Sequence, residues 1–199
     1  MTTFARAVRP GADIAAIARH LDELGHDQRV AEVRSLARAQ VGQLYELATG
    51  RACSLAHFVP AGVAAGQPVR HFGLNSLAIF RTFEKRFMRS PQDPSVGWGY
   101  NHQLWQWFTG PGYFVVRDVG CAHPDGLDER EQLFINYYEV ADQQPAGWPA
   151  LRDNNGLPAS LVYGKMCDYM WRVSEHVSVG AAYKEGKAYG AFFVLCREA

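Results

Sequence analysis

Residues 177–197, VSVGAAYKEGKAYGAFFVLCR, carry the clearest strand pattern in the chain. Val177, Val179 and Tyr183 fall on alternating positions, which is the spacing of a β-strand. The turn residues Glu185-Gly186-Lys187 follow, and the chain then returns through a second apolar run. This stretch therefore predicts an antiparallel β-hairpin at the end of the chain.

The region between Gly50 and this hairpin has a similar composition. Gly and Pro recur every ten to twenty residues or so, and the runs between them are rich in Val, Phe, Tyr and Trp, which is typical of strands joined by turns. Several runs are apolar on both faces, so one face has to line an interior while the other is covered. We expect strands at 53–59, 69–73, 96–108, 112–119, 131–140, 177–184 and 189–197. Segment 76–89 fits a short helix running into a strand, and segment 165–173 predicts one or two helical turns.

The first fifty residues have a helical pattern instead. Ile14, Ile17 and Leu21 share one helical face before Gly25. A second apolar stripe runs over 27–49 and ends at Gly50, a typical C-terminal cap. We therefore expect a single domain over 1–199, with a helical hairpin in 1–50 and an antiparallel barrel in 51–199.

Composition restricts the function classes. The chain has 199 residues, of which 48% are hydrophobic and 20% charged, and its formal net charge is zero. A neutral chain has no broad field to attract phosphates, so nucleic acid is not an expected partner. No apolar run is long enough for a signal peptide or a membrane span, and the four cysteines are spread singly. These features predict a cytoplasmic protein with no membrane partner.

Segment 97–114, GWGYNHQLWQWFTGPGYF, is the strongest candidate for a binding site. Seven of its eighteen residues are aromatic, with amide and imidazole groups between them. Large flat side chains beside a few polar groups are what a pocket for a small organic molecule requires. Trp98, Tyr100 and His102 share one strand face whereas Trp105 and Trp107 occupy the other, so we expect a bulge or bend.

Candidate site residues follow from this pattern. Expected ligand-binding residues are the aromatic walls and polar handles Asn101, Trp105, Trp107, Tyr113, Asn136 and Tyr137. His102 and Glu84 are the candidate catalytic residues, because either one can shuttle a proton if it is partly desolvated. Asp168 and Glu175 are further carboxylates of that kind. Lys85 belongs to a short cationic run that is interpreted as a solvated face.

Metal and cofactor motifs are not indicated. The histidines show no metal-ligand spacing, and Thr109-Gly110-Pro111-Gly112 is better explained as a turn than as a phosphate loop. No serine lies in a nucleophile elbow and no cysteine has an adjacent base. The expected cofactor and metal content is therefore none.

Residues 161–198 resemble the end of small lipocalin-like (calycin-type) β-barrels of the GXWXG type. The residues that carry the resemblance are Tyr163, Arg172, Val179, Gly180, Phe192, Phe193 and Arg197. The signature Gly-x-Trp-x-Gly itself is absent, and Gly97-Trp98-Gly99 is the nearest fragment. The resemblance implies a barrel with an interior cavity and no particular reaction.

Together these patterns predict an α+β protein. In it, an N-terminal helical hairpin packs on a strongly bent antiparallel sheet of about seven or eight strands, closed or nearly closed as a lipocalin-like barrel. The first functional hypothesis is binding of a small hydrophobic or aromatic molecule in the barrel cavity. The alternative is a cofactor-independent acid/base enzyme, an isomerase, cyclase or lyase, that uses the same cavity. A third is an interaction module that presents the aromatic residues of 97–114 outward. No pattern in the sequence indicates an oligomeric state.

Overall fold

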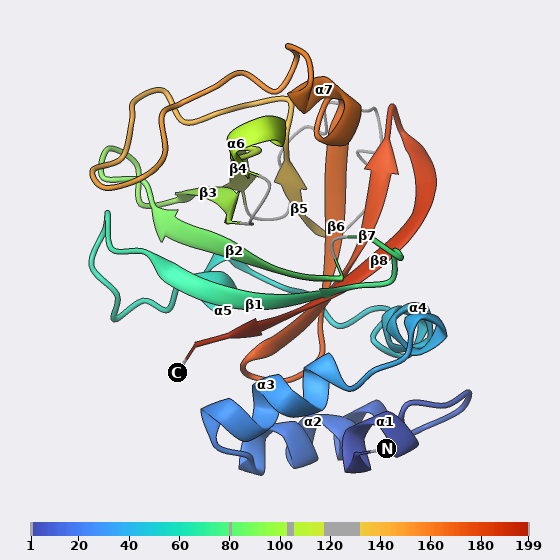
Figure 1. The fold of residues 1–199 in the computed structure, drawn as a ribbon. Coiled ribbons are helices and arrows are strands. Elements are labelled where there is room, and N and C mark those ends of the chain that lie inside the picture. The colour runs from blue at the N-terminus through green and yellow to red at the C-terminus, as the bar shows by residue number, and fades with distance from the viewer. Residues whose placement is uncertain (1, 80, 103–105, 118–131, 199) are drawn as a thin grey trace.

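Eight antiparallel strands form a closed barrel (Figure 1). The computed structural model describes residues 2–79, 81–102, 106–117 and 132–198. Each strand pairs with its neighbours in sequence, and the last strand pairs with the first. The strands are β1 (Val69–Asn75), β2 (Thr82–Arg89), β3 (Val96–His102), β4 (Phe114–Arg117), β5 (Leu133–Asn136), β6 (Met166–Arg172), β7 (Val177–Lys184) and β8 (Lys187–Arg197).

The predicted C-terminal hairpin is confirmed, and it closes the barrel. β7 and β8 pair across a two-residue turn, in which Glu185 has φ 51° and Gly186 has φ 74°. Positive φ at both turn residues gives the twist that a tight hairpin needs. β8 then pairs with β1 on its other side, so this hairpin joins the two ends of the sheet.

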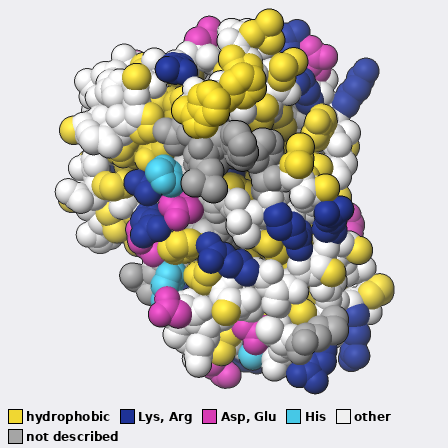
Figure 2. Space-filling model, in the orientation of Figure 1, with side chains coloured by type: hydrophobic (Ala, Val, Ile, Leu, Met, Phe, Trp, Pro, Cys, Tyr) yellow, Lys and Arg dark blue, Asp and Glu magenta, His cyan; other side chains and the backbone are white. Residues whose placement is uncertain are grey.

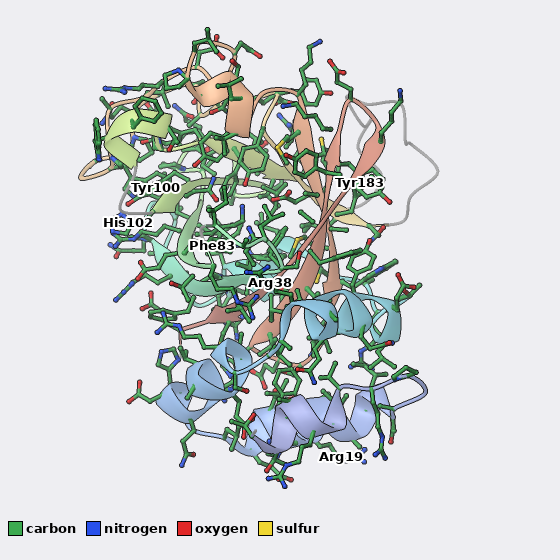
Figure 3. All side chains as sticks on the ribbon, turned by 45° about the vertical axis from the view of Figure 1, so that its right-hand side comes forward. Arg19, Arg38, Phe83, Tyr100, His102 and Tyr183 are labelled. Atoms are coloured by element: carbon green, nitrogen blue, oxygen red, sulfur yellow. The ribbon has the colours of Figure 1, made fainter. Side chains whose placement is uncertain are left out.

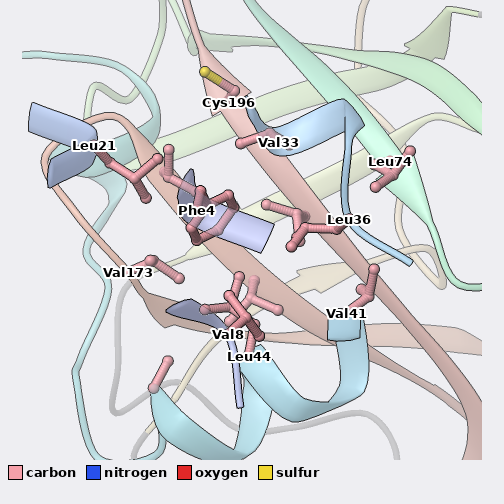
Figure 4. Packing of buried hydrophobic residues seen from close by; sticks show 14 of the residues in the cluster. Phe4, Val8, Leu21, Val33, Leu36, Val41, Leu44, Leu74, Val173 and Cys196 are labelled. Atoms are coloured by element: carbon pink, nitrogen blue, oxygen red, sulfur yellow. The ribbon is translucent and has the colours of Figure 1, made fainter. Parts of the chain in front are cut away.

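Helices cover one outer wall of the barrel. The helices are α1 (Thr3–Ala7), α2 (Ile14–Glu23), α3 (His26–Arg34), α4 (Arg38–Leu47), α5 (Leu55–Phe58), α6 (Gln106–Thr109) and α7 (Ala159–Val162). Phe4, Leu21 and Leu44 of the N-terminal helices share a buried cluster with Val179 of β7 and Val194 of β8 (Figure 4). The N-terminal segment therefore buries the outward apolar face of β7 and β8, while α6 and α7 lie on the other side of the barrel (Figure 1).

The expectation of a two-helix hairpin in residues 1–50 was wrong, because the second stripe is broken into α3 and α4. Leu36 is buried in the break, and its carbonyl accepts a hydrogen bond from Arg81 in the β1–β2 connection. Ala37 starts α4 with an extended backbone, and its N–H donates to the Gln40 side chain at 2.8 Å. The contacts that Leu36 makes with the barrel therefore favour a break between α3 and α4, although the helical spacing of apolar residues continues through it.

Four local assignments also differ from the sequence predictions. Segment 53–59 contains the short helix α5 instead of a strand, and segment 165–173 contains strand β6 instead of helical turns. In β6, Met166 and Met170 face the interior while Tyr169 faces outward, so period two underlies the apparent helical spacing. Strand β3 ends at His102, and α6 begins at Gln106. The expected bulge falls on 103–105, outside the described residues, and the helix expected within 76–89 is absent from the described part of that segment.

One end of the barrel interior is filled by aromatic rings. Phe58 of α5 lies 5.0 Å from Phe87 between ring centroids, and Phe87 lies 5.1 Å from Phe114. Gly99 makes room for the third ring, because a Cβ there would lie 2.1 Å from Phe114 Cε2. We call this part of the interior the filled end. The opposite end of the interior is open.

Candidate functional site

A cavity of about 300 Å³ occupies the other end of the barrel, which we call the mouth. Its rim is formed by Leu77 and Ile79 after β1, by α7 and by Tyr189 at the start of β8. Its apolar walls include Phe83, Tyr163, Met166, Ala182, Ala191 and Phe193. Its polar groups are Asn75, Lys85, Asn101, Tyr137 and Asp168. The volume is at the lower end of the range for small-molecule sites, and the lining has their usual composition.

A buried ion pair lies across the bottom of this cavity. Lys85 Nζ of β2 is 3.2 Å from Asp168 Oδ2 of β6, and the two side chains are 3% and 5% exposed. β2 and β6 are four strands apart in an eight-stranded closed barrel, so they lie on opposite walls. The pair therefore bridges the lumen, with the rings of the filled end beyond it.

Asn101 and Tyr137 complete the hydrogen bonding of this pair. Lys85 Nζ donates to Asn101 Oδ1 at 2.9 Å and to the Tyr137 hydroxyl. The Tyr137 hydroxyl donates to Asp168 Oδ2 at 3.3 Å, and Asn101 Nδ2 donates to the Gly112 carbonyl at 3.0 Å. An ammonium group has three donors, and each of them has an acceptor here. We call Lys85, Asn101, Tyr137 and Asp168 the polar layer.

Burial shifts the proton affinities of the polar layer. Desolvation lowers the pKa of Lys85, although the Asp168 carboxylate opposes that shift. Desolvation raises the pKa of Asp168 against the opposing charge of Lys85, and it raises the pKa of Tyr137 well above its usual value. The Lys85 ammonium also lies 5.1 Å from the Phe114 ring centroid and 5.2 Å from that of Phe193. Because burial disfavours both charged forms, the pKa values of Lys85 and Asp168 lie closer together than those of the solvated groups, which lowers the cost of moving the proton between them.

Two of the predicted ligand-binding residues, Asn101 and Tyr137, line the cavity. Tyr113 and Asn136 lie elsewhere. Tyr113 packs against Tyr100 and Trp148, outside the residues that line the cavity, and its hydroxyl donates to the Pro149 carbonyl at 2.6 Å. Asn136 Nδ2 donates to Glu139 at 2.8 Å, and Asn136 also is not among the lining residues.

The two predicted catalytic residues, Glu84 of β2 and His102 of β3, lie opposite each other in the register of these strands. Neither is among the residues that line the cavity. Their neighbours Lys85 and Asn101 point inward, so strand alternation directs Glu84 and His102 to the outer face. His102 lies at the edge of the molecule in Figure 3, whereas Phe83 points toward the barrel centre. The structure therefore does not place these two residues in the cavity at the mouth.

The charges around Glu84 also differ from those of a general base. Partial burial acts to raise the pKa of Glu84, but the hydrogen bond and charge of Arg70, with Arg86 nearby, outweigh it and lower that pKa. Glu84 Oε1 accepts from Arg70 at 2.8 Å. Burial and the charge of Arg86 lower the pKa of His102. Glu84 therefore occupies a surface ion-pair network.

Of the predicted tryptophan walls, Trp105 lies outside the described residues and Trp107 is 72% exposed. Trp107 stacks edge-on with Phe108 at 5.8 Å and is not among the lining residues. Figure 2 shows hydrophobic side chains gathered on the upper part of the face it depicts. The described aromatic residues of 97–114 are thus divided between the barrel wall and an exposed helix.

Lys85 is a site residue that the sequence analysis does not identify, because the cationic run 81–89 favours a solvated face. The signal that identifies it is the alternation Phe83-Lys85-Phe87, which places the lysine on the same strand face as two large apolar rings. Asp168 was considered as a carboxylate of perturbed pKa, but its segment was expected to be helical. Only the strand assignment of β6 directs it at Lys85.

Neither a protein-family model, nor a curated protein, nor a solved structure matches this chain. Within the described ranges there is no group of three or more His, Cys, Asp or Glu side chains that could hold a metal ion. In the same part of the chain, none of the helices has the length and apolar character needed to cross a membrane. A function therefore has to be inferred from the residues of the barrel interior.

Proposed function

We propose that this protein binds a small, uncharged, largely apolar molecule in the mouth cavity, with an oxygen atom of that molecule hydrogen-bonded to the polar layer. The observation that carries the proposal is a cavity of about 300 Å³ with apolar walls and a charge-balanced pair at its bottom. Phe83, Tyr163 and Phe193 offer ring surfaces to an aromatic or alicyclic ligand.

The charge balance of the cavity argues for an uncharged ligand. Lys85 and Asp168 carry no net charge together, whichever of them holds the shared proton. An ionised ligand group would be desolvated beside them without a counter-charge of its own, which costs several kcal/mol. A hydroxyl group needs only an acceptor, which the Asp168 carboxylate provides, and a carbonyl oxygen can replace one of the acceptors of the Lys85 ammonium.

A matched pair of ligands tests this proposal. Calorimetric titration with 2-naphthol should show saturable binding, whereas 2-naphthoate, of the same shape but anionic, should bind at least about tenfold more weakly, as 1.4 kcal/mol of desolvation would produce. Ala182→Leu should abolish or greatly weaken naphthol binding, because Ala182 lines the cavity. Ala188→Leu, at an exposed position of β8, is the matched control and should leave binding unchanged. Equal affinity for the two ligands, or binding insensitive to Ala182→Leu, would contradict the proposal.

Asp168→Asn sharpens the same test. The substitution removes the charge that balances Lys85, so a ligand carboxylate can take its place. We expect naphthoate affinity to rise by about tenfold, since a hydrogen bond to a charged group contributes roughly 1.5–3 kcal/mol. If the preference between naphthol and naphthoate does not change, the polar layer does not contact the ligand.

The acid/base alternative is favoured by one observation, which is that Asp168 and Lys85 both line the cavity and lie 3.2 Å apart. In this form the proton shuttle is Asp168 with Lys85, and a ketone with acidic α-hydrogens is a suitable substrate class. Deuterium exchange into 2-tetralone, followed by NMR, tests it. Exchange above the buffer rate should be lost in Asp168→Asn. His102→Ala and Glu84→Gln distinguish the two locations, because only a shuttle at those outer residues would be lost in these variants.

A further inference from the structure

We propose that Lys85 captures carbonyl compounds covalently: its amine condenses with an aldehyde or ketone held in the mouth cavity, and Asp168 becomes the counter-ion of the resulting iminium. This inference rests on the proposed function, because it uses the same cavity and the same class of ligand.

The position of Lys85 differs from that of every other lysine in the chain. Of the four lysines, Lys165 is exposed and pairs with Glu185 at 2.7 Å, Lys184 is half-buried and Lys187 is exposed. Lys85 alone is buried, and it lines the cavity. A carbonyl compound bound between Phe83 and Phe193 would therefore meet a single amine.

The groups around Lys85 supply what imine formation needs. The nucleophile is the neutral amine, and burial lowers the pKa of Lys85, which favours that form. Asp168 Oδ2, at 3.2 Å, can take the ammonium proton. The Tyr137 hydroxyl bonds both Lys85 and Asp168, so it can pass a proton between them and the carbonyl oxygen.

The reaction balances without an oxidant or a reductant. After the proton moves from Lys85 to Asp168, the nitrogen lone pair forms a C–N bond and the carbonyl π electrons move to oxygen. An amine proton passes to that oxygen and gives a carbinolamine. The protonated Asp168 then donates its proton to the hydroxyl, the C–O bond breaks and water leaves. The products are an iminium on Lys85, an Asp168 carboxylate and one water molecule, so the net charge of the polar layer never changes.

This charge conservation is the physical reason for the proposal. An isolated buried iminium would be as costly as an isolated buried ammonium. Here the ion pair Lys85–Asp168 is replaced by another ion pair of the same charges in the same place. The barrel without a ligand therefore already contains the counter-charge that the iminium needs.

Reductive trapping tests the proposal. The full chain is incubated with 2-naphthaldehyde and sodium cyanoborohydride near neutral pH, and its intact mass is measured over time. We expect a single addition equal to the mass of the aldehyde less one oxygen atom, located on Lys85 by peptide mapping. Trapping at Lys85 should exceed that at the exposed Lys187 by about tenfold or more, because the cavity would hold the aldehyde beside Lys85.

Variants separate capture from folding and from simple binding. Lys85→Arg keeps the positive charge but cannot form an imine, so it should lose the adduct, and Lys187→Arg should keep it. Ala182→Leu should suppress the adduct with Lys85 still present. Naphthol titration of the same wild-type preparation distinguishes the two proposals. If naphthol binds but Lys85 is not modified faster than Lys187, covalent capture is wrong and the binding proposal stands. If neither naphthol binding nor the adduct is seen, both are wrong.

Discussion

The filled end and the mouth of the barrel are built from the same eight strands, yet one is packed solid and the other is hollow. At the filled end the side chains pack closely, as where the Phe114 ring fits against Gly99. At the mouth the small residues Ala182 and Ala191 face open space. The two ends differ in the side chains that lie opposite their small residues. The filled end has close-packed apolar contacts. The mouth lacks such contacts and leaves a cavity instead.

The polar layer lies at the boundary between these two regions. On β2 the inward-facing residues are Phe83 at the cavity, Lys85 at the boundary and Phe87 at the filled end. A charge-neutral pair at that level costs less than an isolated charge in either half, because each member satisfies the other. The pair also prevents the apolar packing from extending to the mouth. The filled end therefore contributes close packing, whereas the mouth leaves a cavity with polar groups at its bottom.

Truncating a ring in each half gives the largest difference. Phe87→Ala should lower the free energy of unfolding by about 3–5 kcal/mol, because Phe87 is fully buried and contacts Phe58, His71 and Phe114. Phe83→Ala should cost about half as much, since Phe83 is only partly buried and already borders the cavity. Urea unfolding of both variants measures the two values. Equal losses would show that the mouth is as tightly packed as the filled end.

Breaking the ion pair at the boundary should have the next largest effect. Lys85→Met leaves Asp168 buried without its partner and should cost about 3 kcal/mol near neutral pH. The loss should shrink as the pH falls, because Asp168 then becomes protonated. The double variant Lys85→Met/Asp168→Leu should recover most of the stability, since no buried charge is left. If the double variant is as unstable as the single one, the polar layer contributes to folding through more than its charges.

The contrast between the two ends also shows what the sequence could predict. Alternation in 177–197 identified the closing hairpin, and apolar runs on both faces indicated a barrel with an interior. The same alternation in Phe83-Lys85-Phe87 contained the position of Lys85, but the basic neighbours Arg86 and Arg89 favoured a solvated face. That ambiguity is resolved only by a partner four strands away. Long-range pairing is what a local pattern does not contain.

The two candidate catalytic residues show the same limit. Glu84 and His102 lie opposite each other across β2 and β3, a pairing that the sequence does not predict. Which face of a strand points inward, however, depends on the whole barrel, and a shift of one residue exchanges the faces. Asn101, predicted as a polar handle, and Tyr137, predicted as an aromatic wall, both line the cavity.

The histidines near the filled end predict a pH dependence that the mouth does not share. Burial, then the charges of His71 and Arg197, lower the pKa of His57 to about 3. Burial, opposed by the hydrogen bond that His71 Nε2 donates to the Phe58 carbonyl and aided by the charge of Arg197, lowers the pKa of His71 to about 3. A histidine whose pKa is depressed in the folded state stabilises the fold fully above about pH 6.5. That stability is lost as the pH falls from about 6.5 toward 3.

Chemical denaturation at pH 7, 6 and 5 measures this loss. The free energy of unfolding should fall with decreasing pH, with a limiting slope of about 1.4 kcal/mol per pH unit for each histidine. His71→Phe should reduce that slope by about half, because one of the two titrating groups is removed. Since both rings lie among apolar side chains near α5, naphthol affinity should change less over the same range than stability does. A stability that is independent of pH would contradict the assignment of buried, neutral histidines.

The exposed aromatic helix α6 should contribute least to either half. Trp107 is 72% exposed and does not line the cavity, so Trp107→Ser should change the free energy of unfolding by no more than about 0.5 kcal/mol. Naphthol affinity should stay within about twofold of wild type, because Trp107 is not among the residues that line the cavity in which we propose that 2-naphthol binds. Calorimetry measures both values, and native mass spectrometry of the same samples reports association. A Trp107→Ser variant with unchanged binding but a lower association state would instead support the third sequence hypothesis, in which the aromatic residues of 97–114 face a protein partner, and would add an interface to the division between the filled end and the mouth.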